Sequence, residues 1–277
     1  LWKELYFLGH KGVTVFGLAA IDTALWDAKG KALGQSVAHM LGAARDRVPV
    51  YCSAGLWLSA TPDELAAEAA GYVAEGFRGV KMRVGKKHVE EDVERVAAVR
   101  RAIGPDVSLM CDASRGFTAD HAIRLGRRLE EFDLTWFEEP VAPYDYHGSA
   151  RVAAALDTPI ASGETEATRY GFRSMLEAGA ADIWMADLGR VGGVSEFVKV
   201  AHLAAAHDIA ISNHLFTEQS LCLLGAFGNA TWLEFMPWTA RLYRERITVE
   251  DGHIAVPDRP GLGFTFDLDA VDRHRVR

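Results

Sequence analysis

The chain has 277 residues, of which 49% are hydrophobic, 25% charged and 10% aromatic, a composition typical of globular proteins that excludes a disordered or fibrous one. With 30 basic and 38 acidic residues the formal net charge is −8, which argues against nucleic acid or an anionic membrane surface as a partner. Small-molecule chemistry is the better hypothesis. No stretch approaches the ~20 uninterrupted apolar residues of a membrane span.

The three cysteines, Cys52, Cys111 and Cys222, stand in apolar surroundings. Their odd number and wide spacing fit neither a disulfide framework nor a zinc site. The segment that begins at Leu1 has no signal-peptide pattern. We therefore expect three buried thiols in a protein of the reducing cytoplasm.

In chain order, residues 16–34 come first and predict a long helix that ends at Gly34. From residue 48 onward, short β-rich runs alternate with helical patterns, which is typical of βα units around a parallel sheet. Eight strands are predicted, at residues 48–55, 79–84, 108–113, 134–138, 159–164, 182–187, 209–214 and 231–235.

Amphipathic helical runs connect these strands. Thr61 as N-cap, Pro62 at the first helical position and Glu64 three residues after the cap give the clearest helix start. Thr118 and the Ala-rich face of residues 193–208 indicate further helices that cover a barrel from outside.

The alternation predicts an α/β fold with a TIM-like (β/α)7β barrel over residues 48–235. Residues 1–47 form a segment and helix before the barrel, and residues 236–277 are loop-like with short β character. We expect both end segments to pack on the barrel or on something absent from this chain.

Catalytic groups of such barrels gather at the C-terminal ends of the strands, which open on one mouth. Here seven consecutive predicted strands end in ionisable groups, whereas a random surface charge would be scattered over helices and loops. These groups are Lys81 and Arg83, Asp112, Glu138, Glu164, Asp187, His214 and Glu234.

Three of these groups, Asp112, Glu138 and Glu164, are carboxylates spaced one βα unit apart, and we call them the acidic triad. On adjacent strands they converge, and like charges this close are best relieved by a divalent cation. Hard oxygen ligands, with no His or Cys among them, favour Mg²⁺ over zinc.

Asp187 and His214, again one βα unit apart, predict a dyad in which the carboxylate fixes the tautomer of the imidazole and raises its basicity. Lys81 and Arg83 point to the same side of their strand, and two adjacent cations could lower the pKa of Lys81. Glu234, if protonated, could donate a hydrogen bond to a substrate carboxylate. Together these groups predict proton abstraction next to a carboxylate, with the charge that develops stabilised electrostatically.

The strings WFEEP, SGE, RVGGV, SNHLF and WLEF, and AIDTALWDAKGKALG before the barrel, resemble the enolase superfamily and, within it, the mandelate racemase subgroup. The resemblance implies the acidic triad as Mg²⁺ ligands, Lys81 and Arg83 as the second-strand motif, Asp187 and His214 as base dyad, and Glu234 on the eighth strand. It also implies a small carboxylate substrate and a symmetric homo-oligomer.

Three departures from this family bear on function. Too little chain precedes Phe16 for the family's N-terminal α+β capping domain, so we expect that domain to be missing. Arg83 stands where a catalytic lysine is usual, and Ser114 where the dehydratases often have Asn. We assign Arg83 and Ser114 to substrate binding, and leave the hydroxyl pattern of the substrate open.

The leading hypothesis is a dehydratase of aldonates or aldarates, because the Asp187–His214 dyad needs no second base. One alternative is a racemase or epimerase in which Lys81 replaces that base. The other is a barrel fragment without the capping domain, which binds metal or acids but has no catalytic activity.

Overall fold

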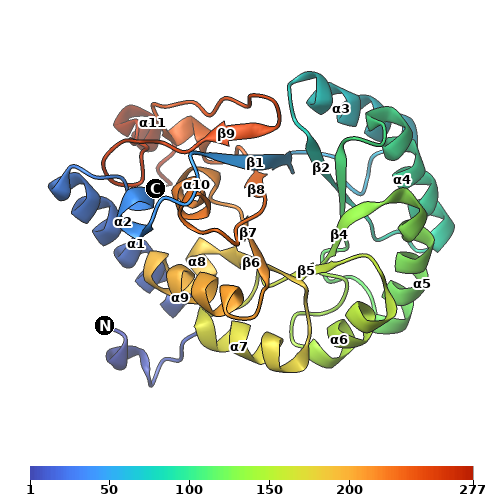
Figure 1. Cartoon of the computed structure of the whole chain (residues 1–277), viewed down its shortest axis with the longest axis horizontal. Helices are drawn as coiled ribbons and strands as arrows, with labels where there is room; N and C mark the ends of the chain where they lie inside the picture. The colour runs from blue at the N-terminus through green and yellow to red at the C-terminus, as the bar shows by residue number, and fades with distance from the viewer. Residues whose placement is uncertain (277) are drawn as a thin grey trace.

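Eight parallel strands surround a central axis in the computed structural model, which describes residues 1–276 (Figure 1). Neighbouring strands pair in the order β7-β6-β5-β4-β3-β2-β1-β8. All eight predicted strands are confirmed, with ends that shift by a few residues. The strands are β1 (Arg47–Cys52), β2 (Gly79–Arg83), β3 (Ser108–Asp112), β4 (Leu134–Glu138), β5 (Ile160–Ser162), β6 (Ile183–Asp187), β7 (Ala210–His214) and β8 (Leu233–Phe235).

The barrel is nearly closed, because β7 and β8 meet through a single backbone bridge and side chains instead of a continuous ladder. Ile211 bridges Ala230, and the Asn213 Oδ1 accepts the backbone N–H of Glu234 at 2.8 Å. The Ser212 hydroxyl donates to the carbonyl of Trp232 at 2.7 Å. Polar side chains thus complete the junction that the backbone leaves open.

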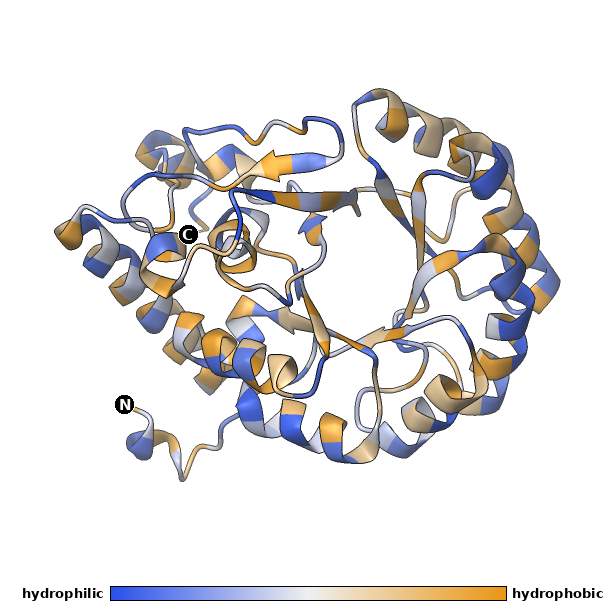
Figure 2. Ribbon diagram, in the orientation of Figure 1, coloured by the Kyte–Doolittle hydropathy of each residue, from blue (hydrophilic) through white to orange (hydrophobic). Residues whose placement is uncertain are grey.

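Helices cover the outside of the barrel, and Figure 2 shows α4 and α5 with hydrophilic residues along their outer side. The helices are α1 (Val13–Leu33), α2 (Val37–Leu41), α3 (Pro62–Ala74), α4 (Val89–Ile103), α5 (Ala119–Leu129), α6 (Tyr146–Ala155), α7 (Thr168–Ala178), α8 (Leu188–Val191), α9 (Val194–Ala205), α10 (Thr217–Ala226) and α11 (Leu268–Arg273), with the short 3-10 helices η1 (Lys3–Leu5), η2 (Glu130–Phe132) and η3 (Ala240–Leu242).

The predicted helix boundaries are confirmed where the sequence signal was explicit. Before α3, the Thr61 hydroxyl accepts the Glu64 N–H at 3.3 Å and the Glu64 carboxylate accepts the Thr61 N–H at 2.8 Å, a complete capping box. Thr118 caps α5. Gly34 ends α1 with φ of 66°, a left-handed conformation that glycine adopts without strain.

The barrel has one apolar layer outside its strands and one inside, because successive strand residues face opposite sides. Residues that face outward pack against the helices and form the larger core. Inside the barrel, below the mouth, a smaller group of buried side chains forms one layer. It consists of Tyr51, Met110, Trp136, Ala161 and Met185.

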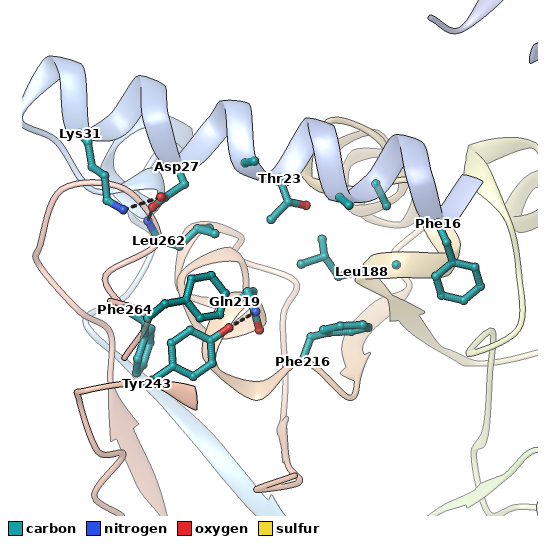
Figure 3. Close-up of a pocket in the computed structure, with 15 residues that line it drawn as sticks. Phe16, Thr23, Asp27, Lys31, Leu188, Phe216, Gln219, Tyr243, Leu262 and Phe264 are labelled. Carbon is teal, nitrogen blue, oxygen red and sulfur yellow. Dashed lines mark hydrogen bonds and ion pairs between the residues drawn. The ribbon is translucent and has the colours of Figure 1, made fainter. Parts of the chain in front are cut away.

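The chain after β8 returns to the N-terminal helices. Strand β9 (His253–Ala255) pairs antiparallel with β1. The sequence indicated short β character in this segment but not its pairing partner. The Leu262 N–H donates to Asp27 of α1 at 2.9 Å. A cavity of about 440 Å³ lies between α1 and this segment, and Phe16, Phe216 and Phe264 are among the residues that line it (Figure 3).

The three cysteines are buried and unpaired, which confirms the prediction of three buried thiols. Within residues 1–276 no helix combines the length and the apolar character that crossing a membrane requires.

Candidate active site

The predicted site residues meet at the mouth because of strand register. Arg83 lies beside Asp112, Asp112 beside Glu138, and Asp187 beside His214 in the parallel ladders. Each belongs to the set of alternate residues that face the barrel interior. The geometric part of the prediction, that these groups gather at one end of the barrel, is therefore met.

Glu164 reaches the mouth by a different route, because β5 ends two residues earlier. Gly163 has φ of +122°, and a Cβ at this position would lie 2.8 Å from Cε1 of Phe172. Glycine is therefore needed for the turn. The buried Glu139 accepts the Gly163 N–H at 2.9 Å and thereby holds this turn, which aims Glu164 into the mouth.

Lys81 is almost fully buried, and its ammonium lies among three carboxylates. Its Nζ is 2.5 Å from Glu138, 2.9 Å from Glu234 and 3.8 Å from Asp112. Burial opposes the charge, but the carboxylates outweigh it and raise the pKa of Lys81 well above its ordinary value. The expectation that Arg83 lowers this pKa is wrong, because anions and not Arg83 are the nearest neighbours.

Glu234 is an acceptor. Its two oxygens face the Lys81 ammonium and the backbone N–H of Leu215, the latter at 2.6 Å. Burial favours the neutral acid, but Lys81, His214 and the Leu215 N–H together hold the pKa of Glu234 below its ordinary value. The prediction of a protonated Glu234 that donates a hydrogen bond is therefore wrong.

The Asp187–His214 dyad forms as the spacing predicted. Nδ1 of His214 lies 2.8 Å from Oδ2 of Asp187, and Nε2 lies 3.3 Å from Oε2 of Glu164. Burial opposes the imidazolium, but the bond to Asp187 and the charges of Glu164 and Glu234 raise the pKa of His214. A carboxylate oxygen accepts hydrogen bonds, so the Nδ1–H of His214 donates to Asp187, and Nε2 faces the mouth.

The two predicted substrate binders, Arg83 and Ser114, both contact Asp112. Nε of Arg83 is 3.3 Å from Asp112 Oδ2, and its guanidinium lies over the Trp57 ring at 4.7 Å. The Ser114 N–H and hydroxyl reach Asp112 Oδ1 at 2.7 and 3.2 Å. Both residues lie at the mouth, and their role in binding substrate stays a prediction.

Protein cations occupy the positions around the acidic triad. Residues 1–276 contain no group of three His, Cys, Asp or Glu side chains placed to hold one metal ion. Lys81 pairs with Glu138, Arg83 with Asp112, and Arg115 with Glu164 at 2.5 Å. A metal would require the carboxylates to exchange these partners.

The donor set nevertheless suits a divalent cation. Burial raises the pKa of Glu138, and the nearby carboxylates Asp112, Glu234 and Glu164 raise it further in spite of Lys81. A further positive charge beside Glu138 would stabilise its ionised form. Three carboxylates offer the hard oxygen ligands that Mg²⁺ prefers.

Two arginines of the mouth, Arg115 and Arg190, were missed from the sequence. Arg115 pairs with Glu164, and Arg190 contacts both members of the dyad. The only sequence signal was their place within a few residues of Asp112 and Asp187. Left-handed backbone angles follow several site residues, at Ser114, Arg115, Glu139, Leu215 and Phe216, and strain of this kind is common at functional sites.

Comparison with known proteins identifies the two parts of the chain. The family model described as "Enolase C-terminal domain-like" matches residues 64–270. The model of the mandelate racemase / muconate lactonizing enzyme N-terminal domain matches residues 2–42, within the segment before the barrel, although we expected that domain to be missing.

Two curated relatives are sugar-acid enzymes by name. The L-talarate/galactarate dehydratase of Salmonella typhimurium is 39% identical over 263 residues, which cover 95% of this chain and 66% of that enzyme. The arabinonate dehydratase of Saccharolobus solfataricus is 34% identical over 291 residues, which cover 100% of this chain and 78% of that enzyme. The chain thus spans about two thirds to four fifths of the length of these relatives.

Solved structures agree over nearly the whole chain. An L-talarate dehydratase from Polaromonas sp., in complex with Mg and L-glucarate, matches with a TM-score of 0.94 at 36% identity. The match covers 98% of this chain and 77% of that enzyme. A racemase from Streptomyces coelicolor with bound magnesium matches with a TM-score of 0.95 at 35% identity, over 99% of this chain and 76% of the racemase. This chain belongs to the enolase superfamily, in the mandelate racemase/muconate lactonizing enzyme subgroup.

Proposed function

We propose that the chain is a magnesium-dependent lyase that removes water from a small sugar acid of the aldonate or aldarate class. The observation that carries the proposal is the dyad, in which His214 binds Asp187 at 2.8 Å and turns Nε2 toward the acidic triad. An imidazole held in this tautomer is a general base. Relatives named as talarate, galactarate and arabinonate dehydratases support the same class of reaction.

Asp112, Glu138 and Glu164 would hold the Mg²⁺. When bound, the ion supplies positive charge that stabilises the substrate carboxylate and the negative charge that develops on it. Lys81, fixed by Glu138 and Glu234, adds a buried positive charge on the same side of the mouth. Arg83 is the candidate to bind a carboxylate or hydroxyl group of the substrate.

In the proposed reaction, Nε2 of His214 takes the proton from the carbon next to the substrate carboxylate. The electron pair of that C–H bond moves into the carboxylate to give an enolate. The imidazolium then gives its proton to the hydroxyl on the β-carbon, the C–O bond breaks, and water leaves. The enol that remains tautomerises to a 2-keto-3-deoxy acid.

A racemase or epimerase is the second candidate, because Lys81 lies inside the mouth and a solved racemase is 35% identical to this chain. As an ammonium with a raised pKa, Lys81 is a poor base in the present arrangement. Dehydration needs only His214 and is therefore preferred.

The test is incubation of the protein with Mg²⁺ and a library of sugar acids, with 2-keto acid detected as its semicarbazone. The proposal predicts keto acid from at least one compound and none with His214→Asn. Running the same reactions in D₂O separates the alternatives. Deuterium next to the carboxylate with inverted product and no keto acid would favour a racemase, and no exchange with any compound would favour a barrel without catalysis.

A further inference from the structure

Arg190 connects three strand ends of the mouth with one side chain. It lies in α8, directly after β6, and its backbone N–H donates to Asp187 Oδ1 at 2.8 Å. Its guanidinium turns back toward the mouth, where Nη1 donates to the backbone carbonyl of Glu164 at 3.0 Å. The same Nη1 lies 3.7 Å from Asp187 Oδ2 and 3.4 Å from Nδ1 of His214.

The contact between Arg190 and His214 is not a hydrogen bond between them. Nδ1 of His214 carries the proton that Asp187 accepts, and a guanidinium has no acceptor atom. His214 donates to Asp187 Oδ2 at 2.8 Å, and the Arg190 guanidinium forms an ion pair with the same oxygen at 3.7 Å. The carboxylate is held from the backbone at one oxygen and from two side chains at the other.

The contact with the Glu164 carbonyl fixes a second element. Glu164 follows the positive-φ turn at Gly163, beyond the last pair of the β5 ladder, so its backbone needs another partner. Its carboxylate lies 3.3 Å from Nε2 of His214. One guanidinium thus sets the position of the base relative to the nearest member of the acidic triad.

We propose that Arg190 is a positioning residue that keeps the His214 imidazole in register with Glu164 and thereby with the substrate carbon. This inference rests on the proposed function for its kinetic part. A misplacement of about 1 Å at a reacting group costs on the order of 100-fold in rate. A lysine carries the same charge, but its side chain is shorter and lacks the planar guanidinium that places Nη1 between Glu164 and Asp187.

The experiment compares wild type with Arg190→Met, Arg190→Lys and the control Arg173→Met, whose arginine pairs with Glu177 on the surface of α7. The first readout needs no turnover: the downfield proton resonance of the His214 Nδ1–H, assigned by its loss in His214→Asn. We expect this resonance in wild type and in Arg173→Met, and a shifted or broadened one in both Arg190 variants. Thermal unfolding of all four proteins shows that each is folded.

The second readout is turnover of the sugar acid that wild type dehydrates. Both Arg190 variants should lose about 100-fold in kcat while KM changes by less than about threefold, because Arg190 acts through His214. An unshifted resonance in Arg190→Met overturns the inference, and so does wild-type kcat in Arg190→Lys. Absence of the resonance from wild type also overturns it. If no sugar acid reacts, the proposed function fails, but the His214 Nδ1–H resonance still tests whether Arg190 positions the imidazole.

Discussion

At the scale of single residues, the mouth is a set of carboxylates that each have a cationic partner. Burying like charges is costly unless each is paired, and breaking such a pair leaves an uncompensated charge. Lys81 neutralises more of these carboxylates than any other cation of the mouth, because its ammonium faces Glu138, Glu234 and Asp112. The cations that stabilise the site without metal are thus the groups with which a metal competes.

Lys81→Met should therefore destabilise the metal-free protein by about 3–5 kcal/mol, because Glu138 and Glu234 lose their shared ammonium. Added Mg²⁺ should recover more stability in this variant than in wild type. Urea unfolding with and without Mg²⁺ measures both effects. Lys31→Met, which removes a solvent-exposed pair with Asp27, is the control. Equal stability of Lys81→Met and wild type would contradict the assigned pairing.

The buried acid Glu218 gives a pH-dependent prediction away from the acidic triad. Burial raises the pKa of Glu218 above its ordinary value of 4.5, although Thr239 donates to it at 3.0 Å. Because the pKa of Glu218 is higher in the folded than in the unfolded chain, its protonated carboxyl stabilises the fold. This contribution is complete below about pH 4.5 and is lost as the pH rises through the folded pKa. The Tm of wild type should thus fall relative to that of Glu218→Gln as the pH rises above about 4.5. Parallel plots of Tm against pH for wild type and Glu218→Gln would contradict a raised pKa of Glu218.

At the scale of elements, the strands and helices that carry the site are specified locally. Alternation of apolar residues sets which side chains face the barrel interior, and cap residues set where helices start. The turns after the strands are different, because left-handed residues such as Ser114 and Leu215 are not ones that favour this conformation. Neighbouring elements hold them, as when the Arg115 N–H donates to the Glu139 carbonyl at 2.8 Å.

The capping box of α3 gives a prediction at this scale. Thr61→Ala removes the hydroxyl that accepts the Glu64 N–H and should lower the free energy of unfolding by about 1 kcal/mol. Thr61→Ser keeps the hydroxyl and is the matched control. Denaturant unfolding of the three proteins checks this, and a Thr61→Ala variant as stable as Thr61→Ser would contradict it.

At the scale of the whole molecule, the barrel and the convergence of its strand ends were predictable because both follow from a repeated local pattern. The sequence also placed Asp187 beside His214, since one βα unit separates them. It could not predict the ionisation of Lys81 and Glu234, which depends on contacts between β2, β4 and β8. Arg115 and Arg190 were missed for the same reason, because their roles depend on Glu164, which comes from another strand end.

We propose that Asp112, Glu138 and Glu164 together bind Mg²⁺ at the mouth. Isothermal titration of the protein with Mg²⁺ tests it most directly, with Asp112→Asn, Glu138→Gln and Glu164→Gln beside the surface control Asp120→Asn, whose aspartate pairs with Arg151. We expect one Mg²⁺ per chain in wild type and in the control, and an affinity at least about 10-fold weaker in each variant of the acidic triad, since every one removes a ligand charge. An equal affinity in all five proteins, or no binding by wild type, would contradict it.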